Sequence, residues 1–208
     1  MDAGRTRWRR FGVVMGGSVV LTAGVVALAA SGAVAASFTV SGQQFKVSAD
    51  RLVANGFVQY GAVDAEAARG SKTPVPRPVA ISAMKDAKLT NLCQSVVTDL
   101  GSFGSLTLKI TAGDGDKPVT ATNMYVDMDQ LDGDAMFSGM EIGRDGASLD
   151  KGPADSDAAK AQRQAMFAQQ ADSVTITNLK QVAWGTSAAT FNLYNLKLRL
   201  SSGKNECF

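Results

Sequence analysis

An uncharged run of 26 residues, from Phe11 to Ala36, is the sequence feature that most constrains this chain. A helix needs about 20 apolar residues to cross the hydrocarbon core of a membrane, so the run is long enough to span one. Four arginines, at positions 5, 7, 9 and 10, precede it. Because basic flanks stay in the cytoplasm, we expect residues 1–10 to form a cytoplasmic tail and residues 37–208 an extracytoplasmic domain.

The same run has features of a cleavable signal peptide. Ala33-Val34-Ala35 fits the small-x-small pattern of a cleavage site, and cleavage there would release a secreted domain. The run is longer than the roughly 7–15 apolar residues of a typical signal peptide, which favours an uncleaved anchor. Gly12 and Gly16 have the spacing through which two membrane helices pack closely. We expect a signal-anchor helix over 11–36 in the cell membrane, with secretion as the alternative.

The positive charge of the chain is concentrated before the apolar run. The formal net charge is +2, and the four arginines together with Asp2 contribute +3, which leaves about −1 for the rest of the chain. A domain with this charge lacks the basic excess that nucleic-acid binding requires. We therefore expect no nucleic-acid partner.

The chain contains no histidine. This absence excludes Ser-His-Asp and Cys-His catalysis and every zinc site that uses histidine. The G-x-S-x-G motif of serine hydrolases is also missing from the sequence. These absences favour a protein that is not an enzyme, and we assign no catalytic residue and no cofactor.

Two cysteines, Cys93 and Cys207, lie in the predicted extracytoplasmic domain. An even pair of cysteines in an oxidising compartment predicts a disulfide. Such a bond closes a loop of more than a hundred residues, for which chain entropy gives an upper limit of roughly 4–5 kcal/mol of stabilisation. Two unpaired thiols are the alternative.

Alternation of apolar and polar residues predicts that the domain is mainly β. A curved antiparallel sheet and an irregular β-solenoid both fit the pattern. Strands are predicted near 79–90 and, most clearly, over 105–112, where Leu106, Leu108 and Ile110 alternate with polar residues. Residues 91–100 fit either a helix or a strand.

Turn residues divide these alternating stretches. Asn55-Gly56 and Asp132-Gly133 have the composition of hairpin turns and predict hairpins over 52–63 and 119–142. Three prolines between positions 74 and 78 predict a loop outside the sheet.

Residues 158–171 are rich in alanine and predict one short soluble helix. Asp155, Ser156 and Asp157 precede it and suit a helix N-terminus. Asparagine followed by leucine recurs at Asn91, Asn178 and Asn195, without a fixed period.

The acidic stretch from Asp114 to Asp157 contains weak candidates for a metal site. Carboxylate oxygens are the ligands that Ca²⁺ prefers, and the candidates are Asp114, Asp116, Asp132 and Asp134. The spacing differs from that of an EF-hand loop, which needs a glycine where Asp132 stands. A solvated acidic surface without metal is the alternative interpretation.

Seven runs of the domain together resemble one family of exported actinobacterial proteins of about this length. The runs are GFVQYGAV (56–63), LCQSVV (92–97), LTLKITAGDG (106–115), VTATN (119–123), MEIGRD (140–145), QQADSVTITNLKQVAW (169–184) and ECF (206–208). Proteins of that family are often labelled cholesterol esterase, and their genes tend to lie beside one for a small multi-pass membrane protein. The resemblance implies an exported or anchored protein with a membrane partner, and it assigns no catalytic residue.

Three hypotheses for function follow. The first is a membrane-anchored, non-enzymatic domain that binds lipid or another apolar ligand, together with a multi-pass membrane partner. The second is a structural subunit of an oligomeric membrane complex, including a homo-oligomer packed through the Gly/Ala-rich run. The third is the esterase or lipase activity that the label implies.

Overall fold

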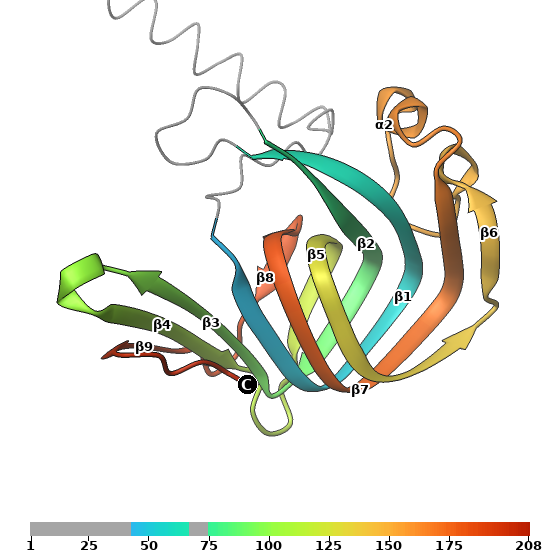
Figure 1. The fold of residues 1–208 in the computed structure, drawn as a ribbon. Helices are drawn as coiled ribbons and strands as arrows, with labels where there is room; N and C mark the ends of the chain where they lie inside the picture. The colour runs from blue at the N-terminus through green and yellow to red at the C-terminus, as the bar shows by residue number, and fades with distance from the viewer. Residues whose placement is uncertain (1–42, 67–74) are drawn as a thin grey trace, which may run out of the picture. The chain divides into compact units, whose positions relative to one another are not determined.

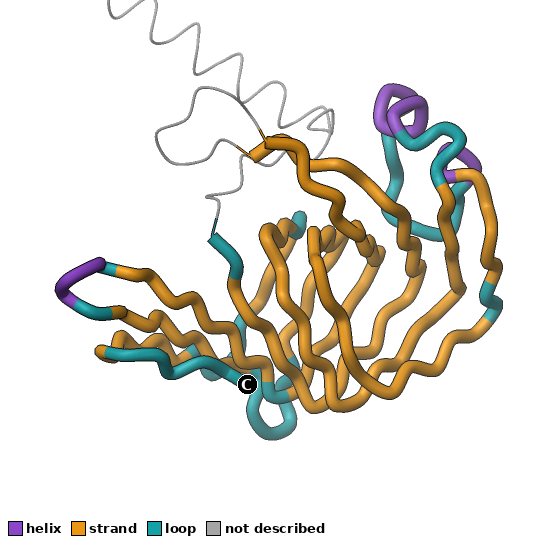
Figure 2. Tube along the Cα trace, in the orientation of Figure 1, coloured by secondary structure: helices purple, strands orange, loops and turns teal. Residues whose placement is uncertain are grey.

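The computed structural model describes residues 43–66 and 75–208, which form a nine-stranded antiparallel sheet (Figures 1 and 2). The predicted membrane segment 11–36, with Gly12 and Gly16, lies outside the described residues. The strands are β1 (Phe45–Glu66), β2 (Val75–Thr90), β3 (Leu92–Asp99), β4 (Ser105–Ala112), β5 (Val119–Ser138), β6 (Glu141–Asp145), β7 (Phe167–Ser187), β8 (Thr190–Asn192) and β9 (Lys197–Ser202). Two 3-10 turns, η1 (Gly101–Phe103) and η2 (Gly146–Ser148), and the helix α2 (Asp157–Gln162) connect them.

The long strands pair in a closed circuit. The sheet order is β6-β7-β5-β2-β1-β3-β4-β9, and β7 also pairs with β1, so that β1, β2, β5 and β7 each have two neighbours from this group of four. Strands β3, β4 and β9, here called the wing, continue the sheet away from the circuit (Figure 1). The prediction of a mainly β, antiparallel fold is confirmed.

The main core occupies one face of the four long strands. Its largest members come from all four of them and include Phe57, Met84, Met128 and Ile176. The ring of Phe57 also packs against Phe137 of β5, with 5.5 Å between the ring centroids. A second, smaller cluster lies on the opposite face and consists of Val58, Tyr60, Ala83, Leu149 and Ala168.

Asparagines in the left-handed conformation let the bent strands keep apolar side chains on one face. Asn91, Asn123 and Asn178 have φ values of 53°, 46° and 55°. The residues flanking each of them at a spacing of three all belong to the main core: Leu89 and Leu92, Ala121 and Met124, Ile176 and Leu179. In a regular strand this spacing puts two side chains on opposite faces. At these three asparagines, two of which precede a leucine, the chain bends and the next apolar side chain returns to the core face.

The predicted hairpin at Asn55-Gly56 is wrong, because β1 runs through it. Gly56 has a φ of 66°, and Ala54 and Phe57 on either side of it are both buried in the main core. The glycine bends the strand instead of reversing it. Gly56 lies where a Cβ would be 2.6 Å from Lys151 O, so a larger residue is excluded by space as well as by backbone conformation.

We expect Gly56→Ala to lower the free energy of unfolding by about 2–4 kcal/mol, because alanine resists positive φ and its methyl group would clash with Lys151 O. Gly61→Ala is the matched control in the same strand, since nothing lies within 4 Å of its added Cβ. The control should change stability by less than about 1 kcal/mol. Equal effects of the two variants in urea unfolding would contradict this account of the bend.

The predicted hairpin over 119–142 is also wrong. Strand β5 continues through Asp132 and Gly133, where its pairing with β7 shifts register. The chain passes Gly139 and then forms β6, which pairs antiparallel with β7 as β5 does. Gly133 thus accommodates an irregularity in a long strand, a role that its turn-like sequence context hides.

Two of the three prolines lie inside the sheet, contrary to the prediction. Strand β2 pairs with β1 as far as Val75, but with β5 only from Ala80 onward. At Pro76 and Pro78, β2 has no strand partner on the side of β5 among the described residues, so the missing N–H groups are tolerated there.

The predicted helix over 158–171 is mostly wrong. Helix α2 ends at Gln162, and Phe167 already begins β7. The expected N-terminus is correct, since the Ser156 hydroxyl accepts a hydrogen bond from Ala159 N. Pairing of β7 with β1 and β6 overrides the helix propensity of the later residues. Residues 91–100, which fitted helix or strand, contain β3 at 92–99, and the predicted strands near 79–90 and over 105–112 are confirmed.

Candidate functional site

One face of the wing carries six apolar side chains that neither core covers, together with the polar residues Gln94, Thr98 and Ser202. Three of the apolar side chains form a row, because Leu108 of β4 pairs with Val96 of β3 and with Leu200 of β9. Leu198 and Leu200 are 56% and 61% exposed. We call this surface the leucine face, and its members are Val96, Leu106, Leu108, Ile110, Leu198 and Leu200.

The leucine face continues the face of the sheet that carries the main core. Leu92 and Ala112 are register partners at the base of the wing, and both are buried in the main core. Residues two and four positions along each strand share their face, which places Val96, Ile110 and Leu108 on the same side. None of the six members of the leucine face belongs to either buried cluster or packs against one within the described residues.

The opposite face of the wing is covered by the C-terminal segment. Cys93 and Cys207 form a disulfide across 114 positions, as predicted. The Cys207 N–H donates to Ser95 Oγ at 3.0 Å, and the Asn205 N–H donates to Thr107 Oγ at 3.0 Å. The C-terminus accordingly lies at the base of the wing (Figure 1). The C-terminal segment thus covers part of this face and leaves a pocket lined by Val97, Asp99, Gly104, Ser105, Lys204 and Glu206, whereas no such segment lies over the leucine face in the described part of the chain.

The end of the wing is also apolar. The turn η1 connects β3 to β4 at this end (Figure 2), and its Phe103 is 89% exposed. Leu100, immediately before the turn, is 46% exposed. Phe103 and Leu100 thus add two exposed apolar side chains at the far end of the wing.

Residues 41–208 match the model of DUF6230, described as a family of unknown function. The chain belongs to the DUF6230 family. The match includes all nine strands of the sheet, and so both the core and the wing. No curated protein and no solved structure matches the chain.

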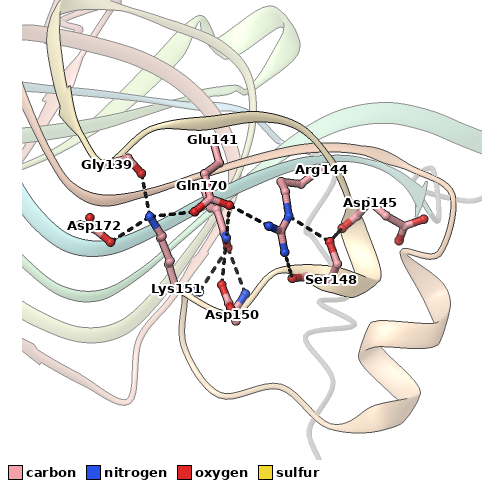
Figure 3. Close-up of polar contacts among 9 residues, drawn as sticks. All are labelled: Gly139, Glu141, Arg144, Asp145, Ser148, Asp150, Lys151, Gln170 and Asp172. Atoms are coloured by element: carbon pink, nitrogen blue, oxygen red, sulfur yellow. Dashed lines mark hydrogen bonds and ion pairs between the residues drawn. The ribbon is translucent and has the colours of Figure 1, made fainter.

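A network of polar side chains holds the segment that follows η2 against the sheet (Figure 3). At its centre is Gln170 of β7, which is 1% exposed. The Gln170 side chain accepts from the backbone N–H groups of Asp150 and Lys151, and it donates to Glu141 Oε2 at 3.0 Å. Lys151 Nζ forms ion pairs with Glu141 at 3.1 Å and Asp172 at 2.9 Å. The Gln170 amide and the Lys151 ammonium hold the pKa of Glu141 below its usual range.

A second polar cluster holds the chain beyond α2. Arg163 is 4% exposed, its guanidinium lies 4.6 Å from the centroid of the Tyr60 ring, and it forms a 2.8 Å ion pair with Asp155. The Tyr125 hydroxyl donates to the other oxygen of Asp155 at 3.0 Å. In both clusters the charged groups bind one another, and this arrangement positions a loop on the sheet.

Burial raises the pKa of the phenols of Tyr60 and Tyr125, and the charge of Asp155 raises both further. Above about pH 10 the tyrosines of the unfolded state ionise, whereas Tyr60 and Tyr125 of the folded state stay protonated to a higher pH. The stability that they contribute is therefore complete below about pH 10 and is lost as the pH rises through the folded-state pKa values. In a Tyr194→Phe background, which leaves only these two tyrosines, we expect the tyrosinate absorbance to rise together with the loss of the β circular-dichroism signal. A full absorbance rise while the sheet stays folded would contradict the raised pKa values.

Three of the four weak calcium candidates make separate polar contacts. Asp114 binds Lys197 Nζ at 2.7 Å, Asp134 accepts from Asn178 at 3.0 Å, and Asp132 accepts from a neighbouring glutamine. Asp116 is exposed. Across 43–66 and 75–208, no group of three or more His, Cys, Asp or Glu side chains is arranged to hold a metal ion.

The membrane assignment concerns a part of the chain that the structure leaves undescribed. Among the described residues, no helix has the length and apolar character needed to cross a membrane.

Proposed function

We propose that this protein is a membrane-anchored, extracytoplasmic member of the DUF6230 family that binds lipid or another apolar ligand on the leucine face. A multi-pass membrane protein, which the family resemblance implies, acts beside it. The observation that carries the proposal is the leucine face itself, an apolar sheet surface that continues the main core yet lies outside it.

Burial of apolar surface favours the binding of a ligand to the leucine face. Fully burying a leucine side chain contributes about 1.5–3 kcal/mol. Leu198 and Leu200 keep more than half of their surface exposed, so covering them contributes roughly 1 kcal/mol each. Contiguous apolar patches on soluble domains commonly mark sites where a ligand, a membrane or a partner binds.

The entry of the chain into the domain supports a membrane-derived ligand. Gln43 Nε2 donates to Val97 O of β3 at 2.6 Å, so the chain enters the sheet beside the wing. Six residues lie between Ala36, where the proposed anchor ends, and Gln43. Six residues reach at most about 22 Å when fully extended, and so short a connection to the proposed anchor suits a ligand that comes from the membrane.

A fluorescent fatty-acid probe tests the proposal on the full-length protein in detergent micelles. Leu198→Ser/Leu200→Ser should weaken probe binding about tenfold, because both substitutions place hydroxyl groups on the leucine face while leaving the core intact. The matched control is Met136→Ser/Phe191→Ser, which changes two exposed apolar residues outside the wing. Equal binding by the wild type and the leucine variant would overturn the proposal.

A further inference from the structure

Strand β9 has one open edge. It stands last in the order of the sheet and pairs with β4 alone among the described residues. Gly203 N donates to Ser105 O at 2.8 Å, in register with the pairing of the two strands. In an antiparallel pair, the backbone N–H and C=O groups of successive residues point alternately toward and away from the neighbouring strand. Those of Arg199 and Ser201 therefore point toward β4, and those of Leu200 and Ser202 point outward.

The side chains of β9 place charge on one face and apolar surface on the other. Arg199 lies directly opposite Lys109 of β4, and like charges in this arrangement destabilise a sheet. Lys109 Nζ donates to the backbone oxygen of Glu206, and neighbouring Lys197 pairs with Asp114. The described residues supply no hydrogen bond or ion pair to Arg199. An acidic side chain beside β9 would reduce the repulsion between Arg199 and Lys109.

We infer that β9 accepts an extended segment of a partner protein, whose side chains alternate between acidic and apolar. Its backbone would pair with the outward groups of Leu198, Leu200 and Ser202, as in other cases where a peptide adds a strand to a sheet. Its acidic side chains would lie beside Arg199, and its apolar ones would widen the leucine face. The partner segment binds the open edge of β9, and this inference does not depend on which apolar ligand binds the leucine face.

Charge argues for such a partner over a second copy of the chain. If two β9 strands paired antiparallel, the cationic face of one, with Lys197 and Arg199, would lie against the same cations of the other. Like charges at opposed positions disfavour that pairing. A strand with acidic residues on the same face replaces the repulsion with attraction.

The probe is an acetylated hexapeptide of alternating glutamate and valine, labelled with a fluorophore. We measure its anisotropy with full-length, oxidised protein in detergent micelles, against a peptide of alternating lysine and valine. The glutamate peptide should bind at least tenfold more tightly than the lysine peptide. Arg199→Glu should reverse this preference, and equal binding of the two peptides to the wild type would overturn the inference.

Ser202→Pro tests the backbone pairing, because it removes an outward N–H from an edge strand, where proline is tolerated. We expect it to weaken binding of the glutamate peptide about tenfold, while the control Ser202→Ala binds the peptide as the wild type does. Unchanged peptide binding by a folded Ser202→Pro variant would contradict the inference. A concentration-dependent dimer that Ser202→Pro abolishes would also overturn it, by identifying a second copy as the occupant.

Discussion

Replacing both Cys93 and Cys207 with serine is expected to lower the free energy of unfolding by about 4 kcal/mol. The bond joins residues separated by 114 positions, and a loop of this length confines the unfolded chain strongly. The folded state also uses the bond to hold the C-terminal segment on the wing, through contacts of Asn205 and Cys207 with β4 and β3. Guanidinium unfolding monitored by circular dichroism measures the loss.

Wild-type protein treated with a reductant is the independent control for the serine variant. Both should lose similar stability, because both remove the same crosslink. A loss below about 1 kcal/mol in either case would show that the wing and its C-terminal segment are held without the disulfide.

Arg163→Ala is expected to lower the free energy of unfolding by roughly 3–5 kcal/mol, since it leaves the largely buried Asp155 carboxylate without its cationic partner. The side chains of Arg163 and Asp155 are only 5% and 13% exposed, and the guanidinium also covers the ring of Tyr60. Arg144→Ala is the matched control, because its ion pair with Glu141 is more than a third exposed and should contribute at most about 1 kcal/mol.

Adding Asp155→Ala to Arg163→Ala should recover part of the lost stability, since the unpaired carboxylate is then absent. Strictly additive losses in the two single variants and the double variant would contradict a direct coupling between these residues.

Local patterns predicted those elements of the fold in which alternation is uninterrupted. Strand β4 has the predicted bounds because Leu106, Leu108 and Ile110 alternate with polar residues throughout. The disulfide and the cap at Ser156 were predictable for similar reasons, since each depends on residue type and a short context.

The errors have a common cause in the bent strands. Gly56 and Gly133 occur in dipeptides that usually reverse a chain. Pairing with β2 and β7 keeps β1 continuous through Gly56, and pairing with β7 alone keeps β5 continuous through Gly133. Asn178 bends β7 in a similar way, and Asn91 lies at the bend between β2 and β3. The sequence shows both as an Asn-Leu dipeptide, which also occurs at Asn195 outside the strands. The role of these asparagines could not be predicted from the sequence, because only the sheet shows that residues three apart share a face.

The leucine face was only partly predictable. Alternating leucines at Leu106 and Leu108, and again at Leu198 and Leu200, identify two amphipathic strands. The sequence does not tell that β4 and β9, almost a hundred residues apart, lie side by side, or that the C-terminal segment covers the other face. Long-range pairing therefore converts two ordinary amphipathic strands into one exposed apolar surface.

Native mass spectrometry of the full-length protein, released from detergent micelles, tests the proposed ligand binding most directly. The account predicts a species heavier than the protein by the mass of one lipid or another apolar molecule. The same species should be absent or strongly reduced in Leu198→Ser/Leu200→Ser and present in Met136→Ser/Phe191→Ser. Repeated preparations of the wild type that show only the mass of the protein, or an adduct that persists equally in the leucine variant, would contradict the account.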